Sequence, residues 1–268
     1  MKTKLKGYIK RIIEILKKPE MKILPGNMAF YFVLSLIPIL TIIILIASFF
    51  SISIDLVNDL VLDIFPNKVA DAVISIISGK GFDGNIGAFN IIAFIVSTNG
   101  TYSIIASSNT LYKVEKTDYL KDRIKAFLIL LIIVLLLFFL LIVPILGGQI
   151  LKILENFKVF DGELMILYDI IKWPLTFLII YFNLKLIYTI SPSKTISSKE
   201  TTNGAFFTTL FWVIITALFS YYVTYFARYD ILYGNLSTII MLMIWLYALC
   251  FVFVLGMAIN ATPMNNSK

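Results

Sequence analysis

Six long apolar stretches limit what this 268-residue chain can fold into. Each is close to the roughly 20 residues that an α-helix needs to cross about 30 Å of hydrocarbon. A water-soluble core could not hide so much apolar surface, because 59% of the residues are hydrophobic and only 15% are charged. Soluble domains are typically about 45–50% apolar and about 25% charged. We therefore predict an all-α membrane protein with six transmembrane helices, at about 28–50, 87–110, 126–148, 168–190, 204–226 and 236–260.

The distribution of Lys and Arg between the loops predicts the direction of the chain, because cytoplasmic loops are enriched in these residues. With the N-terminus inside, the inside segments hold 16 of the 23 Lys and Arg residues, and the outside loops hold five. We therefore expect a multi-pass protein with both termini in the cytoplasm. The use of many Lys and few Arg residues, with abundant Ile, is typical of bacteria with AT-rich genomes, so the expected site is the bacterial cytoplasmic membrane.

The chain divides into a basic arm at 1–27, a six-helix membrane domain at 28–262 and a short cytoplasmic tail at 263–268. Apolar residues recur at helical spacing among the lysines of the arm, which predicts an amphipathic helix in the plane of the headgroups. Because the arm directly precedes an apolar span, its expected partner is the anionic inner leaflet and not nucleic acid. In the first outer loop, 51–86, apolar residues between aspartates predict short helices on the outer surface.

Polar residues inside the spans are informative, because hydrocarbon offers them no hydrogen-bond partner. Two interpretations stay open for them: they line a polar cavity or hinge, or they pack helices closely through small and hydroxyl side chains. Pro38 adds a possible kink, since it removes one backbone donor. The candidates are Asn27, Tyr31, Ser35 and Pro38 at the first span, Asn99, Gly100, Ser103 and Ser107 in the second, and Gly256 and Asn260 in the sixth.

Arg228 lies among tyrosines at the outer end of the fifth span. Its long side chain could snorkel to the outer headgroups as an anchor, or it could bind the phosphate of an anionic lipid or substrate. We therefore regard it as a candidate contact for anionic headgroups.

The residues needed for enzyme chemistry are missing from the sequence. There is no histidine, which removes the commonest general base and metal ligand. The single cysteine, Cys250, excludes a disulfide within the chain. The segment GKGFDG lacks the Lys-Ser/Thr ending of a phosphate-binding loop. We therefore predict no catalytic residues, no metal site, no cofactor and no enzymatic activity.

Four segments together resemble the YihY/BrkB family of polytopic inner-membrane proteins, which formerly carried the mistaken label ribonuclease BN. In chain order they are NMAFYFVLSLIPIL, STNGTYSIIASSNTLYKVE, NGAFFTTLFW and YGNLSTIIMLMIWLYALCFVFVLGMAINA. They spread over nearly the whole chain. One departure is the STNG of the second span, where the family often has an aromatic residue.

The resemblance implies six spans with cytoplasmic termini, which agrees with the count of loop charges. Members of the family have been associated with envelope integrity and lipid export. The resemblance therefore suggests a transporter or flippase-like protein for a lipid, or another amphiphilic or anionic substrate, in envelope maintenance. The alternative is a membrane scaffold or envelope-integrity factor that transports nothing. The nuclease label fits these residues badly.

Overall fold

The computed structural model describes residues 2–49, 86–115, 117–156, 163–225, 233 and 237–262, and the secondary structure in this part of the chain is all α-helical. The prediction of an all-α protein is therefore confirmed. The helices are α1 (Lys2–Leu16), α2 (Pro19–Phe49), α5 (Ile86–Leu111), α6 (Tyr119–Asn156), α7 (Glu163–Ile190), α8 (Thr202–Tyr225) and α10 (Ser237–Ala261).

Six of these helices coincide with the six predicted spans, but two of them extend well beyond the apolar runs. The helix α2 begins at Pro19, so residues 20–27 of the predicted arm continue directly into the first span. Proline suits the first position of a helix, where its missing N–H costs nothing. The helix α6 runs past both ends of the predicted span 126–148. Hydropathy detects only the apolar middle of such a helix. The charged residues of the end turns lower the mean hydropathy, although the helix continues through them.

Within the part of the chain that the structure describes, three helical segments are long and apolar enough to cross a membrane. They are Ile170–Ile190, Thr202–Val223 and Ile239–Ala261. Large apolar side chains on these helices stay exposed, such as Trp173 at 70% and Phe182 at 60%. The predicted helices of the first outer loop, the tail at 263–268 and Arg228 lie outside the described residues.

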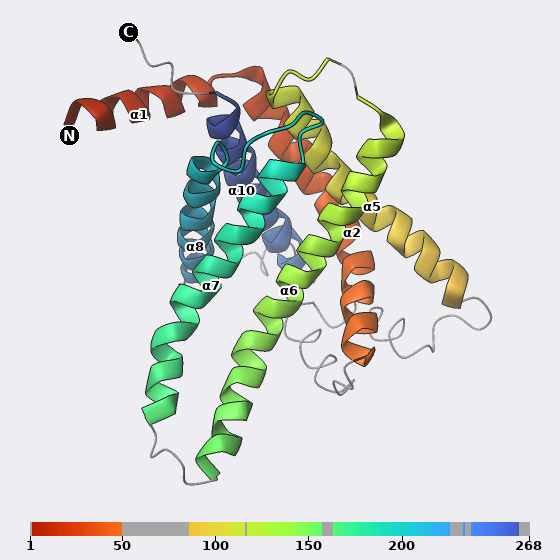
Figure 1. Cartoon of the computed structure of the whole chain (residues 1–268), viewed down its shortest axis with the longest axis vertical. Coiled ribbons are helices and arrows are strands. Elements are labelled where there is room, and N and C mark those ends of the chain that lie inside the picture. The colour runs from red at the N-terminus through yellow and green to blue at the C-terminus, as the bar shows by residue number, and fades with distance from the viewer. Residues whose placement is uncertain are drawn as a thin grey trace.

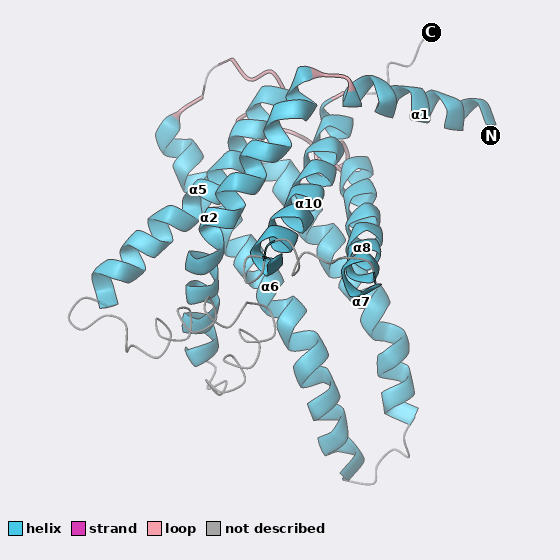
Figure 2. Cartoon of the chain, turned by 180° about the vertical axis from the view of Figure 1, so that it is seen from behind, coloured by secondary structure: helices cyan, strands magenta, loops and turns pink. Residues whose placement is uncertain are grey.

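The long helices form a ring in which each packs against the next, in the order α2, α5, α6, α7, α8 and α10, and α10 returns to α2. Successive helices are antiparallel, so the loops after α5 and α7 lie at the same end as α1 and the last turn of α10 (Figure 1). We name this end the α1 end. Seen from behind, α6 and α7 extend furthest from it (Figure 2).

The helix α10 supplies the largest share of the core cluster, towards the α1 end. Nine consecutive residues of α10, Val252 to Asn260, are all buried. In a helix that faces lipid on one side, buried and exposed residues usually alternate with the helical period. Most of the apolar residues in this run belong to the same core cluster as Met28 of α2 and Ile105 of α5, which are less than 2% exposed. The helix α10 therefore has neighbours around most of its circumference in this region.

The helix α1 is attached to the bundle at the C-terminal end of α10. Ile15 of α1 is buried in the core cluster, and Arg11 donates a hydrogen bond from Nη2 to the carbonyl oxygen of Ile259 at 2.6 Å. The last carbonyls of a helix have no partner within the helix, and the macrodipole there favours positive charge. Arg11 therefore caps α10.

The C-terminal end of α5 is closed by two backbone hydrogen bonds of the Schellman type. The N–H of Val114 bonds to the carbonyl of Asn109 at 2.9 Å, and that of Lys113 to the carbonyl of Thr110 at 3.2 Å. Lys113 has a φ of 53°, the left-handed conformation that this motif needs and that glycine usually supplies. The motif turns the chain sharply and leaves Asn109 facing the next helix and loop.

Candidate functional site

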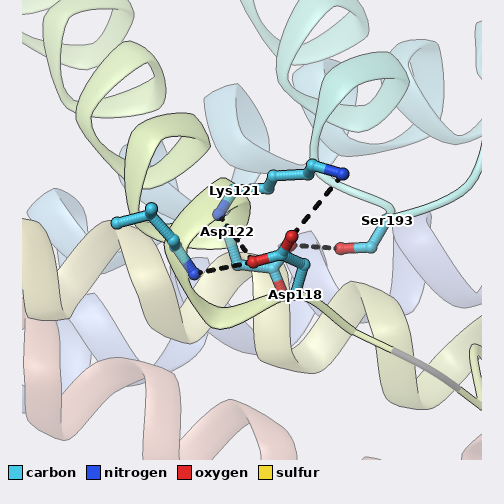
Figure 3. Close-up of polar contacts among 5 residues, drawn as sticks. Asp118, Lys121, Asp122 and Ser193 are labelled. Atoms are coloured by element: carbon cyan, nitrogen blue, oxygen red, sulfur yellow. Dashed lines mark hydrogen bonds and ion pairs between the residues drawn. The ribbon is translucent and has the colours of Figure 1, made fainter.

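Buried polar side chains connect α5, α6 and the loop after α7 at the α1 end. Asn109 holds Ser193 twice: its Nδ2 donates to Ser193 Oγ at 2.9 Å, and its Oδ1 accepts from the Ser193 backbone N–H at 2.7 Å. Ser193 Oγ in turn donates to Asp122 Oδ1 at 2.5 Å, a bond that Figure 3 shows. Asn109 Nδ2 also lies 3.4 Å from Asp122 Oδ2. These bonds tie three separate segments together.

A pair of serines lies beside this network. Ser191 Oγ donates to Ser108 Oγ at 3.2 Å, and both side chains are fully buried. We name the set Ser108, Asn109, Asp122, Ser191 and Ser193 the polar clasp. Lys125 adds a further bond between the same elements, from Nζ to the carbonyl of Pro192 at 2.9 Å. The α1 end is therefore closed by exchangeable hydrogen bonds as well as by apolar contact.

Asp122 contributes the charged group of the clasp and is only 2% exposed. Its hydrogen-bond donors are the hydroxyl of Ser193 and the amide of Asn109, both neutral. In the described residues the ion pair nearby belongs to Asp118 and Lys121, at 3.5 Å. Asp122 lies in the first turn of α6, where the macrodipole favours negative charge. A buried carboxylate that has no cation partner among the described residues depends on all of these groups, so removing one donor weakens the whole clasp.

Asp118 fixes the start of α6 next to the clasp. Its Oδ1 accepts from the backbone N–H groups of Leu120 and Lys121 at 3.1 and 3.3 Å, as an N-cap residue does. The backbone hydrogen bond from Lys121 is the main cause that lowers the pKa of Asp118. The cap orients the first turn of α6 and so aims Asp122 at Ser193.

Tyr112 is buried next to the clasp, directly after α5. Burial, with a smaller effect of the nearby Glu200 carboxylate, raises the pKa of Tyr112 to about 12. Its hydroxyl has no hydrogen-bond partner among the described residues. Lys194 lies 5.0 Å from the centre of its ring and donates to its carbonyl at 3.2 Å. The ring therefore packs under the loop that the clasp holds.

Tyr112→Phe is expected to reduce the loss of stability at alkaline pH. The unfolded chain releases the phenol proton near pH 10, whereas the folded chain holds it to about 12. The free energy of unfolding therefore falls as the pH rises from 10 to 12, by at most about 3 kcal/mol from this residue. The variant lacks this contribution and loses no hydrogen bond at neutral pH. Unfolding titrations of both proteins at pH 8 and pH 11 measure the difference. If the free energy of unfolding falls equally in both proteins between pH 8 and pH 11, the raised pKa of Tyr112 is contradicted.

Two of the predicted site residues, Gly256 and Asn260, lie in a close contact between α8 and α10. Asn260 Oδ1 accepts from the backbone N–H of Gly204 at 2.7 Å, and its Nδ2 donates to the carbonyl of Thr201 at 3.3 Å. A side chain at Gly256 would overlap Thr208 and would approach the carbonyl oxygen of Gly204 to 2.9 Å. We name this contact, made by Thr201, Gly204, Thr208, Gly256 and Asn260, the glycine seam.

Tyr188 of α7 extends the glycine seam to a third helix. Its hydroxyl forms a hydrogen bond with Thr208 Oγ1 at 2.7 Å and donates to the carbonyl of Phe253 at 2.7 Å. A Cβ added at Gly256 would lie 2.8 Å from the same hydroxyl. The polar groups of the seam are thus satisfied between helices, which is the arrangement that helix packing in lipid favours.

Three predicted residues, Tyr31, Ser35 and Gly100, belong to the contact between α2 and α5. Ser35 Oγ bonds to the carbonyl of Tyr31 at 2.7 Å and approaches the carbonyl of Val96 at 3.4 Å. A Cβ added at Gly100 would lie 2.6 Å from Ser35 Oγ. Ser103 forms its hydrogen bond within α5, to the carbonyl of Gly100 at 2.6 Å. These contacts are of the kind that the helix-packing interpretation requires.

The remaining predicted residues are dispersed. Asn27 is exposed on α2, and Ser107 is buried with a hydroxyl that has no partner among the described residues. Asn99 accepts from Arg123 at 2.9 Å. Pro38 lies within α2, and its side chain is outside the described part of the structure. The structure thus places Tyr31, Ser35, Gly100, Gly256 and Asn260 in two helix contacts and leaves Asn27, Asn99, Ser103 and Ser107 apart from them.

Sequence analysis missed the clasp, because its residues lie in short loops and helix ends that look solvated. Asp122 stands between Lys121 and Arg123 in a strongly basic segment, where a carboxylate suggests a surface ion pair. Among the described residues there is also no group of three His, Cys, Asp or Glu side chains that could hold a metal ion.

The fold defines the class of the protein: it is an all-helical membrane protein with apolar helices of spanning length. The profile of the family described as Virulence factor BrkB matches residues 13–268, so the chain belongs to the BrkB family.

Relatives in other bacteria agree with this assignment. The chain is 28% identical over 247 residues to the ribonuclease-like protein YfkH of Bacillus subtilis, which covers 91% of this chain and 90% of YfkH. It is 24% identical over 256 residues to a UPF0761 membrane protein of Psychromonas ingrahamii, covering 92% and 84% of the two chains. A UPF0761 membrane protein of Haemophilus influenzae is 30% identical over 86 residues, or 32% of each chain. No solved structure matches this chain.

Proposed function

We propose that this chain crosses the cytoplasmic membrane six times, with both termini in the cytoplasm, and moves a lipid or another amphiphilic, anionic substrate in envelope maintenance. Six helices longer than 20 residues form its ring. The α1 end, to which the basic loops belong, is the cytoplasmic end in this proposal, because Lys and Arg concentrate there.

The arm supports this orientation. Lys10, Lys17 and Lys18 are exposed around the attached helix α1, while Ile15 faces the bundle. A helix with this division of charge lies in the headgroup region, and each lysine near an anionic leaflet contributes about 1 kcal/mol of attraction. The arm is then an amphipathic anchor that attaches the ring to the inner leaflet.

The observation that carries the proposal is the polar clasp. Transport by alternating access needs one end of a helix ring that can open and close. Tight apolar packing resists such a change, whereas hydrogen bonds between side chains can be exchanged for bonds to water. The clasp joins a carboxylate, three serines and an amide where three segments meet. In this interpretation the structure corresponds to a state closed on the cytoplasmic side.

Lipid movement in reconstituted vesicles tests the proposal. The full chain is incorporated into liposomes that contain headgroup-labelled phosphatidylglycerol or phosphatidylcholine, and a membrane-impermeant reductant bleaches the outer-leaflet label. We expect the inner-leaflet phosphatidylglycerol label to become accessible only in vesicles that contain the protein. Vesicles with denatured protein are the control. Bleaching that equals that of empty vesicles, across a panel of labelled lipids and anionic amphiphiles, would refute transport.

A second candidate function, a scaffold without transport, is favoured by the glycine seam. The contact of Gly204 with Gly256 brings two helix backbones close together, because a Cβ added at Gly204 would overlap the carbonyl oxygen of Gly256. A rigid α8–α10 unit suits a protein that holds partners in the membrane. Crosslinking in intact membranes, with photoreactive groups on exposed positions of α7, would recover a defined partner if this alternative is correct.

A further inference from the structure

A second polar cluster, apart from the clasp, surrounds Arg123 between α5 and α6. The guanidinium group lies 4.7 Å from the centre of the Tyr102 ring and 5.2 Å from that of Tyr119. Its Nε donates to the hydroxyl of Tyr119 at 2.9 Å, and its Nη1 donates to Asn99 Oδ1 at 2.9 Å. The two rings contact each other edge to face, with centres 6.1 Å apart. Arg123 is therefore held in a fixed orientation by three side chains.

The hydrogen-bonding capacity of this guanidinium is not used up. Arginine carries five N–H donors in a planar fork, and two of the N–H groups of Arg123 have partners in the described part of the chain. The hydroxyl of Tyr119 accepts from Arg123 and keeps its own hydrogen for another acceptor. Tyr119 is 62% exposed, so the cluster is open on this side.

The charge of Arg123 is also uncompensated within the described residues. The neighbouring Lys121 pairs with Asp118, and Lys125 is directed at the carbonyl of Pro192. No carboxylate lies within ion-pair distance of Arg123 in the part of the chain that the structure describes. Arg123 is only partly buried, so a ligand from outside the chain can reach its guanidinium. The position is therefore suited to an anion that comes from outside the chain.

An apolar stripe begins beside Arg123 and follows α6. Its residues are spaced three or four apart, so they share one face of the helix. They are all exposed, by 37% to 69%: Leu120, Ile124, Leu128, Leu131, Leu135 and Phe139. An α-helix rises about 15 Å over ten residues, which is about half the hydrocarbon thickness, so ten residues span one leaflet. The stripe is thus long enough for the acyl chain of a lipid in one leaflet.

We propose that Arg123, held by Tyr102, Tyr119 and Asn99, binds the phosphate group of an anionic phospholipid whose acyl chain lies along this stripe. The fork of free N–H donors matches two phosphate oxygens, and the Tyr119 hydroxyl supplies a third hydrogen bond. The positive charge of Arg123, which has no carboxylate partner among the described residues, favours a lipid with a net negative charge over a zwitterionic one. The site does not depend on the transport proposed above, because it concerns equilibrium binding.

Competition between two lipids tests this site. The full chain is exchanged into micelles that contain equal amounts of phosphatidylglycerol and phosphatidylcholine with the same acyl chains, and bound lipids are counted by native mass spectrometry. We expect the protein to retain phosphatidylglycerol in preference, and Arg123→Gln to lower that preference about tenfold, as expected for the loss of charge-assisted hydrogen bonds. Tyr119→Phe keeps the ring but loses the hydroxyl, and should lower the preference by a smaller factor.

Lys121→Gln is the matched control, because it removes a positive charge two residues away that already has a partner. It should leave the preference unchanged. An equal loss in Lys121→Gln and Arg123→Gln would mean attraction by overall charge and would overturn the proposal. Displacement of the lipid by inorganic phosphate at the same concentration would also overturn it, since a free anion would then be the ligand. If Arg123→Gln does not fold, Arg123→Lys retains the charge without the fork and should show an intermediate preference. A negative flux experiment with this binding intact would refute transport alone.

Discussion

Oxidation of a Ser108→Cys/Ser191→Cys variant is expected to stop lipid movement, and reduction to restore it. The two hydroxyl oxygens lie 3.2 Å apart on α5 and on the loop after α7, so thiols at these positions start close to each other and a small approach brings them to disulfide distance. The bond would replace an exchangeable contact of the clasp by a covalent one. We expect flux to fall about tenfold or more on oxidation, because alternating access requires this end to open. The measurement is the bleaching assay before and after a reductant.

No competing disulfide complicates this experiment, since Cys250 is the single native cysteine and can be replaced by alanine. The two single-cysteine variants, treated with the same oxidant, are the controls and should keep their flux. A disulfide that forms fully while lipid movement continues would show that the clasp does not open during transport. In that case the α1 end stays closed during the transport cycle, and the result supports the scaffold alternative.

Gly256→Ala is expected to destabilise the protein, although alanine usually stabilises a helix. The added methyl group would overlap Thr208 and crowd the hydroxyl of Tyr188 and the backbone oxygen of Gly204. Two of these groups are held by hydrogen bonds between helices, so relief of the overlap breaks bonds in the glycine seam. Overpacking and one lost buried hydrogen bond together cost about 2–4 kcal/mol. Unfolding of the purified variant in a denaturing detergent titration measures the change.

Gly26→Ala provides a control of opposite sign. Gly26 is also within a helix, but its added Cβ would meet only a ring atom of Tyr247 at 3.9 Å, an ordinary contact. Alanine is favoured over glycine in a helix by up to about 1 kcal/mol, so this variant should be as stable as the parent or slightly more stable. Similar stability of the two variants would mean that α8 and α10 are not in close backbone contact.

The helices themselves were predictable from the sequence, because an apolar run of spanning length has few alternatives to a helix. The ends were less predictable. The first turn of α6 carries Lys121, Asp122 and Arg123 and looks like a loop, but it is fixed by the Asp118 cap. Local hydrogen bonds of this kind depend on geometry that hydropathy does not contain.

The candidate site was predictable only in part, for a physical reason. Gly256 and Asn260 were identified as a small and polar stripe, yet their partner Gly204 lies in another helix, 56 residues from Asn260 in the sequence. Asn109 and Ser193 are 84 residues apart. Such pairs meet because the ring places α8 next to α10 and brings the end of α5 to the loop after α7, and a single sequence does not state this neighbour order. Arg228 and the outer loop remain predictions.

The central position of α10 has a consequence for how the protein is made. It packs between α2 and α8, and it is the last of these helices to leave the ribosome. Until then, the faces of α2 and α8 that carry Met28 and Gly204 have no partner in the ring, and lipid or the insertion machinery must cover them. The bond from Arg11 to the carbonyl of Ile259 can form only after residue 259 has been translated. Attachment of the N-terminal helix is therefore a late event in biosynthesis, and it follows the insertion of α10 into the ring.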